Sequence, residues 1–259
     1  MKLIDHFRNL TSNDFLKNQR QLAADSLKKM GLPTLKWEDW KYTPLNALIE
    51  TEFERAQSLT SHVSFTSSHV FNESAHSIVF INGHFSKEHS HISTLPEGLQ
   101  ITSLKEALLN PSTIFKKTLG QISTFNKAPF AALNLSAFED GCLVQVSKNV
   151  KIGSPIQILY LSEQKTPFMS FPRNLIVMEE GSEAQIIEAY EGSNIYFNNA
   201  VTEVQLAENA KLEYTKLQQE SLNAFHIHQC TVHQTANSQF ISTVIDLGAR
   251  LARNDLNAL

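Results

Sequence analysis

The feature that most constrains this chain is a two-strand unit that recurs through its second half. The clearest copies are centred on Ala184-Gln185-Ile186, Ala210-Lys211-Leu212 and Ser238-Gln239-Phe240, with centres 26 residues apart (184 to 210) and then 28 apart (210 to 238). Each copy has the pattern of a strand, a short polar turn and a second strand. Units of this size that bury one face against a neighbour predict a solenoid of β-strands, a β-helix. The alternative is a β-sandwich built from similar hairpins.

Alternation of apolar and polar residues supports the strands. Thr202, Val204 and Leu206 share one face of a strand, while Glu203 and Gln205 share the other. The same division returns after the polar turn at residues 207–209. We therefore expect one face of each strand to be buried and the other to lie in solvent.

Composition limits the function classes. The 259 residues are 42% hydrophobic, enough for a packed core, and the net charge of −4 comes from interspersed charges of both signs. Neither a nucleic acid nor a membrane surface is expected as a partner, because no basic patch is visible. Cys142 and Cys230 are too few for a disulfide framework, and neither a signal peptide nor a transmembrane run is seen. A cytoplasmic location is expected.

The first half of the chain has helical patterns. Residues 13–30 predict a helix, with Ser12 or Asn13 as its cap, Gly31 after its last turn and Pro33 preventing its continuation. A second, shorter helix is expected after Pro44.

A connecting stretch over residues 58–73, rich in Ser, Thr and His, leads into a mixed region. A strand at 77–81 ends in the turn Asn82-Gly83, and a helix starts at Ser103, which has Glu106 at capping-box spacing. Residues 128–138 predict a short helix before Asp140-Gly141. We expect three regions: residues 1–72 helical, 73–139 mixed α/β, and 140–259 a β-helix that is incomplete at its C-terminal end.

Several stretches, in order along the chain, match a known family. They are Leu32-Pro-Thr-Leu-Lys-Trp-Glu-Asp-Trp-Lys-Tyr-Thr-Pro-Leu45, Ile81-Asn-Gly-His-Phe85 with Leu95-Pro-Glu-Gly98, Phe130-Ala-Ala-Leu-Asn134 with Asp140-Gly141, Pro172-Arg-Asn-Leu-Ile-Val-Met-Glu-Glu-Gly181, and Leu247-Gly-Ala-Arg-Leu-Ala-Arg-Asn254. Together they resemble the SufB/SufD family of iron–sulfur cluster assembly proteins, and SufD within it. The resemblance covers almost the whole chain.

The resemblance implies a mainly β protein, a right-handed parallel β-helix preceded by an N-terminal α-helical region. It also implies a non-catalytic scaffold subunit that pairs with the homologous SufB and is bound by the ATPase SufC. In that family, sulfur comes from a cysteine desulfurase, ATP is bound by SufC, and an iron–sulfur cluster is built at the interface with SufB.

The resemblance also implies a longer protein. Family members continue through more β-helix and a C-terminal helical region, so this chain is expected to be truncated at Leu259. The residues that contact SufB, SufC and the cluster would lie beyond that point. Expressed alone, the piece is expected to expose its last strand and to self-pair.

One stretch carries metal-ligand chemistry. On a strand, His226, His228 and Cys230 would point the same way and offer donors suited to zinc or iron. Phe225 and Ile227 on the opposite face favour a solvent-facing position for the histidines, with no ligand role. Cys230 could also point inward if a bulge shifts the register.

Three other interpretations stay open. Trp37, Trp40 and Tyr42 could form a carbohydrate or peptide surface, but a packing anchor for the helical region is favoured. Gly181 and Gly192 are isolated turn residues without a phosphate-loop lysine, so any ATP would be bound by a partner. The runner-up functions are a SufB-like scaffold that binds a cluster itself and, more distantly, a polysaccharide lyase using the charged residues Arg173, Arg250, Arg253, Asp246 and Asp255.

Overall fold

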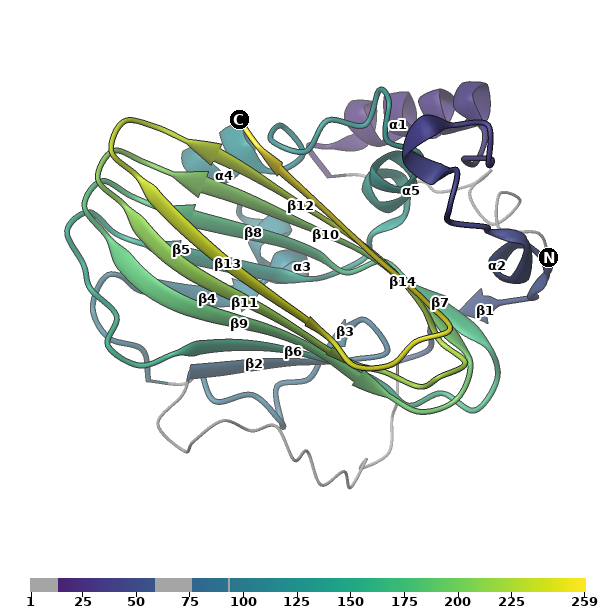
Figure 1. The fold of residues 1–259 in the computed structure, drawn as a ribbon. Helices are drawn as coiled ribbons and strands as arrows, with labels where there is room; N and C mark the ends of the chain where they lie inside the picture. Colours follow the sequence, from purple (N-terminus) through teal and green to yellow (C-terminus); the bar gives the residue numbers. More distant parts are fainter. Residues whose placement is uncertain (1–13, 59–75, 93) are drawn as a thin grey trace.

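The computed structural model describes residues 14–58, 76–92 and 94–259 (Figure 1). The predicted β-helix is confirmed: from β8 onward the chain passes alternately between two facing sheets, and strands that follow one another within a sheet are parallel. The expected caps Ser12 and Asn13, and nearly all of the expected connection at 58–73 with the boundary after residue 72, lie outside the described residues.

Two sheets make up the solenoid. The first, sheet A, contains β1 (Glu54–Arg55), β4 (Leu99–Ser103), β5 (Cys142–Val146), β7 (Phe168–Ser170), β8 (Arg173–Met178), β10 (Tyr196–Leu206), β12 (Phe225–Gln234) and β14 (Leu251–Ala258). The second, sheet B, contains β2 (His76–Ile81), β3 (His84–Phe85), β6 (Ile156–Ser162), β9 (Glu183–Gly192), β11 (Lys211–Gln219) and β13 (Gln239–Asp246).

Strand register fixes the length of one solenoid turn. Lys211 pairs with Glu183 on one side and with Gln239 on the other, each 28 residues away (183 to 211 to 239). In sheet A, Phe197 pairs with Phe225, also 28 residues on. The interval of 26 expected between the first two copies is therefore wrong, because Ala184 is the equivalent of Leu212 and not of Ala210.

The turn residues mark the same repeat. Gly181, Asn209 and Asn237 have φ angles of 66°, 58° and 57° and stand 28 residues apart (181 to 209 to 237). Positive φ is accessible to glycine and is tolerated by asparagine, which explains why these residue types occupy the corners. Backbone bonds join successive corners, from Gly181 N to the carbonyl of Glu208 and from Asn209 N to that of Ala236.

The helices precede or interrupt the first strands. They are α1 (Lys17–Met30), the 3-10 helix η2 (Glu38–Trp40), α2 (Asn46–Glu50), α3 (Leu104–Leu109), α4 (Thr113–Thr118) and α5 (Pro129–Ala137). The predicted helices before Gly31, after Pro44, at Ser103 and before Asp140 are thus confirmed. The Ser103 hydroxyl accepts from Glu106 N at 3.1 Å, as its spacing predicted.

Apolar residues form two main layers. Inside the solenoid, Val144, Ile176 and Val204 of sheet A face Ile158 and Ile186 of sheet B. A second core lies between the outer face of sheet A and the helices; its strand members are Leu143, Met169, Leu175, Val177, Phe197, Phe225 and Ile227. The helices therefore cover one outer face of the β-helix, and strands such as β8 are buried on both sides.

This cover corrects one expectation. Glu203, expected to face solvent, is fully buried under the helical layer, whereas Lys211 and Glu213 on the outer face of sheet B are exposed. Alternation assigned Glu203 to the outer face, but it could not show that another layer covers that face.

Gly141 provides a test of the packing between β5 and β8. A Cβ at residue 141 would lie 1.6 Å from the carbonyl oxygen of Arg173, whereas one at the exposed Gly153 would meet nothing within 4 Å. We expect Gly141→Ala to lower the free energy of unfolding by about 3 kcal/mol or more and Gly153→Ala to leave it nearly unchanged. Urea denaturation of both variants measures this, and equal effects would contradict the packing described.

Candidate functional site

The polar half of the solenoid interior is the most unusual chemical feature of the molecule. Glu188 of β9 is fully buried there and accepts hydrogen bonds from the hydroxyls of Tyr190 at 2.5 Å, Thr202 at 2.7 Å and Tyr214 at 2.8 Å. Burial, with the charge of Glu188, raises the pKa of both tyrosines well above its ordinary value. The tyrosines therefore stay protonated and act as donors, which compensates the buried carboxylate.

A second buried carboxylate belongs to Glu220. It accepts from Asn198 Nδ2 at 2.7 Å and Gln218 Nε2 at 3.0 Å, and it lies 2.9 Å from His226 Nδ1. Burial opposes ionisation of Glu220, but His226 and these two amides outweigh it and lower the pKa of Glu220. Each carboxylate in the interior is thus surrounded by donors from several strands.

A buried lysine completes the charged set. Lys216 of β11 is fully buried and its Nζ lies 3.2 Å from Asp246 of β13, which also accepts from Asn254 Nδ2 of β14 at 2.6 Å. Burial lowers the pKa of Lys216, and the charge of Asp246 opposes that effect. Lys216, Asp246 and Asn254 therefore link β11, β13 and β14 at the last turn of the solenoid.

The predicted metal candidates are part of this interior. His226, His228 and Cys230 do point the same way, but into the lumen, so the expectation of solvent-facing histidines is wrong. The expectation took the apolar Phe225 and Ile227 as the buried face of a half-exposed strand. Both residues do lie on the outer face, but the helical layer covers them there. No bulge is needed to turn Cys230 inward, since it pairs in regular register with Thr202.

The thiols are poor ligands in this setting. Burial, assisted by the charge of Glu188, raises the pKa of both Cys142 and Cys230, and metals bind the thiolate form. His228 Nε2 lies 3.2 Å from Thr202 Oγ1, and His226 lies against Glu220, so both imidazoles already contact neighbouring side chains. Among the residues described, no three His, Cys, Asp or Glu side chains are arranged to hold a metal ion.

A buried ion pair between two strands of sheet A also makes hydrogen bonds to the helical layer. Glu203 of β10 lies 2.8 Å from Arg173 Nη2 of β8, and its carboxylate also accepts from the backbone N–H groups of Gly120, Ile122 and Ser123 at 2.8 to 3.0 Å. Arg173 also donates to Asn134 Oδ1 of α5 at 2.9 Å. We call these groups the Glu203 junction.

The structure separates the residues considered for a lyase. Arg173 is in the Glu203 junction, Arg253 pairs with Asp255 at 2.8 Å, and Asp246 faces Lys216 in the lumen. Arg250 lies over the ring of Phe225 at 5.8 Å. These contacts divide the five residues among four places, and they do not form one acid–base set.

The favoured role of the aromatic segment is confirmed for Trp40. Its ring packs 5.2 Å from that of Phe130 and lies under the guanidinium of Arg253 at 4.0 Å. Trp37 is half-buried against the same core, whereas Tyr42 is 86% exposed and anchors nothing.

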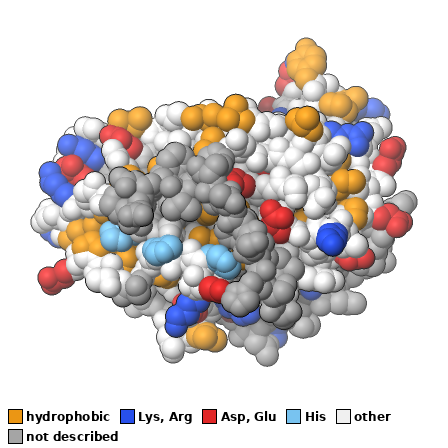
Figure 2. All heavy atoms as spheres, turned by 90° about the horizontal axis from the view of Figure 1, so that it is seen from below, with side chains coloured by type: hydrophobic (Ala, Val, Ile, Leu, Met, Phe, Trp, Pro, Cys, Tyr) orange, Lys and Arg blue, Asp and Glu red, His pale blue; other side chains and the backbone are white. Residues whose placement is uncertain are grey.

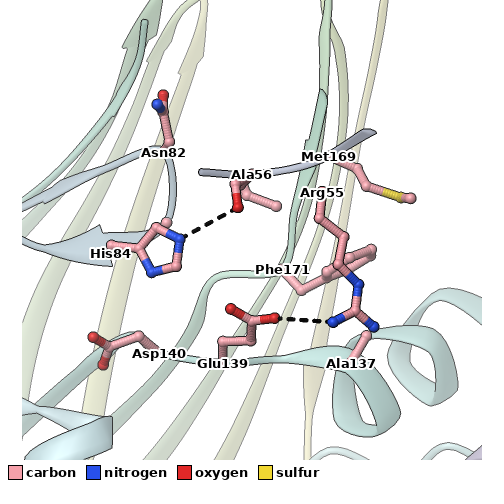
Figure 3. Close-up of a pocket in the computed structure, with 11 residues that line it drawn as sticks. Arg55, Ala56, Asn82, His84, Ala137, Glu139, Asp140, Met169 and Phe171 are labelled. Carbon is pink, nitrogen blue, oxygen red and sulfur yellow. Dashed lines mark hydrogen bonds and ion pairs between the residues drawn. The ribbon is translucent and has the colours of Figure 1, made fainter. Parts of the chain in front are cut away.

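Figure 3 shows a pocket between β1, the β2–β3 hairpin, β7 and the connection from α5 to β5. Arg55 and Glu139 form an ion pair of 3.6 Å on one side, and His84 lies opposite with Nε2 3.5 Å from the carbonyl of Ala56. The cavity volume is about 30 Å³, room for one or two water molecules. The pocket is therefore too small for an organic substrate.

Asp140, at the edge of this pocket, has a structural role. Its carboxylate accepts from the backbone N–H groups of Phe85, Lys105 and Gly141 at 2.8 to 3.3 Å. Burial raises the pKa of Asp140, and these three bonds oppose the shift. Asp140 thus ties the β2–β3 hairpin to the start of α3.

A larger cleft of about 410 Å³ lies between the helical layer and the outer face of β10, β12 and β14. Arg253 crosses it, donating to the carbonyl of Asp39 at 2.7 Å and pairing with Asp255. The charge of Arg253 is thus already balanced by Asp255 within the cleft.

Figure 2 shows another face of the molecule, where histidines gather among scattered charges of both signs and neither sign dominates. In the described part of the chain, no helix combines the length and apolar character needed to cross a membrane.

Sequence reasoning missed Glu188, Glu220 and Lys216 as interior residues. A signal for two of them was present, because Glu188 follows Ala184 and Ile186 at intervals of two, as Lys216 follows Leu212 and Tyr214. Glu220 lies beyond the end of β11, where alternation no longer fixes direction.

Comparison with known proteins connects this architecture to a family. Residues 4–158 match the family model described as "SufBD protein N-terminal region", and residues 160–259 match "SUF system FeS cluster assembly, SufBD core domain". The chain belongs to the SufBD family. The boundary between the two matches falls within β6, so the first strands of the solenoid are part of the SufBD N-terminal region.

SufBD relatives align along most of this chain. An "Iron-sulfur cluster assembly SufBD family protein" of Synechocystis is 31% identical over 258 residues, which cover 95% of this chain and 57% of the relative. "Protein ABCI7, chloroplastic" of Arabidopsis thaliana is 26% identical over 93% of this chain and 52% of its own. The chain thus spans about half the length of these two SufBD relatives.

The Glu203 junction gives a prediction for this SufBD chain. Glu203→Gln would leave Arg173 buried without its counter-charge and present an amide to three N–H groups, so we expect a loss of about 3 to 5 kcal/mol in unfolding free energy. The matched control is Glu180→Gln, in an exposed pair 2.8 Å from Lys148, with an expected loss of about 0.5 kcal/mol or less. Urea denaturation measures both, and a loss no larger than the control's would refute the role of the junction.

Proposed function

We propose that the protein is a SufD-type scaffold subunit of an iron–sulfur cluster assembly complex. The observation that carries the proposal is the match of both SufBD family regions, in order, along a chain folded as a β-helix. In this proposal the protein acts in the cytoplasm by association and not by catalysis. It pairs with SufB, is bound by the ATPase SufC, and supports cluster assembly with sulfur from a cysteine desulfurase.

The interior chemistry favours this assignment over a SufB-like scaffold that binds a cluster through its own Cys230. Cys230 is only 3% exposed, and burial raises the pKa of its thiol, so a cluster would meet a protonated, enclosed sulfur. Cys142 is fully buried in the same core. In the proposed function, a cluster would form at an interface with SufB, while ATP would be bound by SufC.

Association is tested on the protein in its own cell. We expect a tagged copy of the protein to co-purify with untagged SufB and SufC from the same cell, with an untagged copy as the control for non-specific capture. The measurement is the protein composition of the eluate after size-exclusion chromatography. Absence of both partners from a folded, monodisperse protein would overturn the scaffold role.

Cluster binding separates the two family functions. After anaerobic reconstitution with ferrous iron and sulfide, we expect the isolated protein to show no sulfur-to-iron charge-transfer absorbance, and Cys230→Ala and Cys142→Ala to leave its iron content unchanged. If absorbance appears and Cys230→Ala removes it, the SufB-like function is the correct one.

A further inference from the structure

The lumen of the solenoid is divided into an apolar and a polar half. Toward the corner at Gly181, Asn209 and Asn237, the inward residues are apolar, such as Leu212 and Val232. Toward the other end of the same strands the buried inward residues are polar or charged: Glu188, Asn198, Thr202, Lys216, Gln218, His226 and His228, with Glu220 just beyond β11. Two histidines are thus enclosed among fixed charges.

The hydrogen bonds of His228 define its neutral form. Thr202 donates its only hydroxyl proton to Glu188 and accepts from Asn174 Nδ2 at 3.3 Å, so its contact with His228 Nε2 at 3.2 Å requires the imidazole to donate. The neutral ring therefore carries its proton on Nε2. A second proton would go to Nδ1 inside a closed, water-poor space, where a charge is costly.

His226 has a comparable position. Its Nδ1 lies 2.9 Å from Glu220, and its ring lies edge-on to Tyr190 with centroids 4.6 Å apart. Glu220 is already supplied with donors by Asn198 and Gln218. Burial lowers the pKa of His226 and, together with the charges of Lys216 and His226, lowers that of His228 well below its ordinary value.

Every strand around the two imidazoles contributes to their surroundings. The titratable groups that interact with them are Glu188 and Tyr190 of β9, Lys216 of β11, Glu220 after β11 and Asp246 of β13. Tyr196 of β10, Tyr214 of β11 and Cys230 of β12 act on the same two carboxylates, Glu220 and Glu188. From β14, the residues in register with His226, His228 and Cys230 are the uncharged Ala252, Asn254 and Leu256. The positive charge of Lys216 is balanced by Asp246, whose carboxylate lies 3.2 Å from Nζ.

We propose that this polar half makes β12 a proton-sensitive element of the solenoid, closed while His226 and His228 are neutral and opened locally from its neighbours on acidification. Opening exposes the imidazoles to water, where they take up protons that the closed lumen does not accept. Strand β8 has no histidine and stays closed, so the response is confined to β12 and the strands it pairs with.

The sign and size of the effect follow from proton linkage. In the open state the pKa of a histidine returns to about 6.5, so the open state binds more protons than the closed state as the pH falls through that value. Closure is therefore fully favoured above pH 6.5 and weakens below it. Between pH 7.5 and 5.5 each histidine should raise the opening equilibrium by up to about tenfold, and the two together by up to about a hundredfold, the limits for imidazoles that stay neutral in the closed lumen.

Hydrogen exchange on the protein tests this. Exchange of β12 peptides, corrected for the intrinsic pH dependence of amide exchange, is compared at pH 7.5 and 5.5 with that of β8 peptides. We expect a rise of up to about a hundredfold in β12 opening for the wild type, up to about tenfold for His226→Asn or His228→Asn, and none for the double variant. The control is His233→Asn on the same strand, an exposed histidine whose Nδ1 contacts Gln205, which should behave as wild type.

Two results would overturn the proposal. One is an equal pH response of β12 in the wild type and the double variant, and the other is an equal response of β8 and β12. If the variants do not fold, NMR titration of imidazole carbons in the wild type decides: His226 and His228 should stay neutral to pH 5.5. Titration of both near the ordinary value of a histidine would refute the proposal as well.

Discussion

The buried carboxylate of Glu203 is the constraint on which the rest of the architecture depends. A β-helix with one bare apolar face would be unstable in water, and the outer face of sheet A carries Phe197, Phe225 and Ile227. The helical layer covers them, and Glu203 fixes where that layer lies by accepting three backbone N–H groups from the segment after α4. Arg173 balances the charge and, through Asn134, connects the same point to α5.

Inside the solenoid, buried carboxylates are also compensated by donors, but here the donors come from neighbouring turns of the repeat. Parallel strands with a 28-residue repeat stack equivalent residues above one another, so a polar residue at one inward position meets its neighbours from adjacent turns. Glu188 and Glu220 are compensated in this way by hydroxyls, amides and an imidazole from several turns. Both carboxylates are well supplied, but the ring nitrogens of His226 make no hydrogen bond of good geometry to any residue that the structure describes, although Nδ1 lies 2.9 Å from Glu220. A network with such a member is sensitive to any change of charge.

The helical cover of sheet A and the enclosed polar network of the lumen suit the proposed scaffold role, in which the protein acts by association. The charged and polar groups with unusual environments are enclosed, and the small pocket beside Asp140 has no room for an organic substrate. The proposed scaffold role would use a repeat frame with one face covered by helices (Figure 1). The proposed scaffold role and the proton sensitivity of β12 rest on different residues and fail by different measurements.

The sequence by itself determined that the second half is a β-strand repeat with polar turns, and it gave the inward parity of β10 and β11 but not of β12, because alternation and turn residues are local properties of the backbone. It also determined several helix positions, such as the one capped by Ser103. Only the tertiary structure decided which outward faces are wet: Glu203 and Phe225 lie under helices formed far away in the sequence. His226 and His228 are buried for another reason, because they point into the lumen between the two sheets. A strand covered on both sides loses the contrast between faces from which sequence reasoning infers burial.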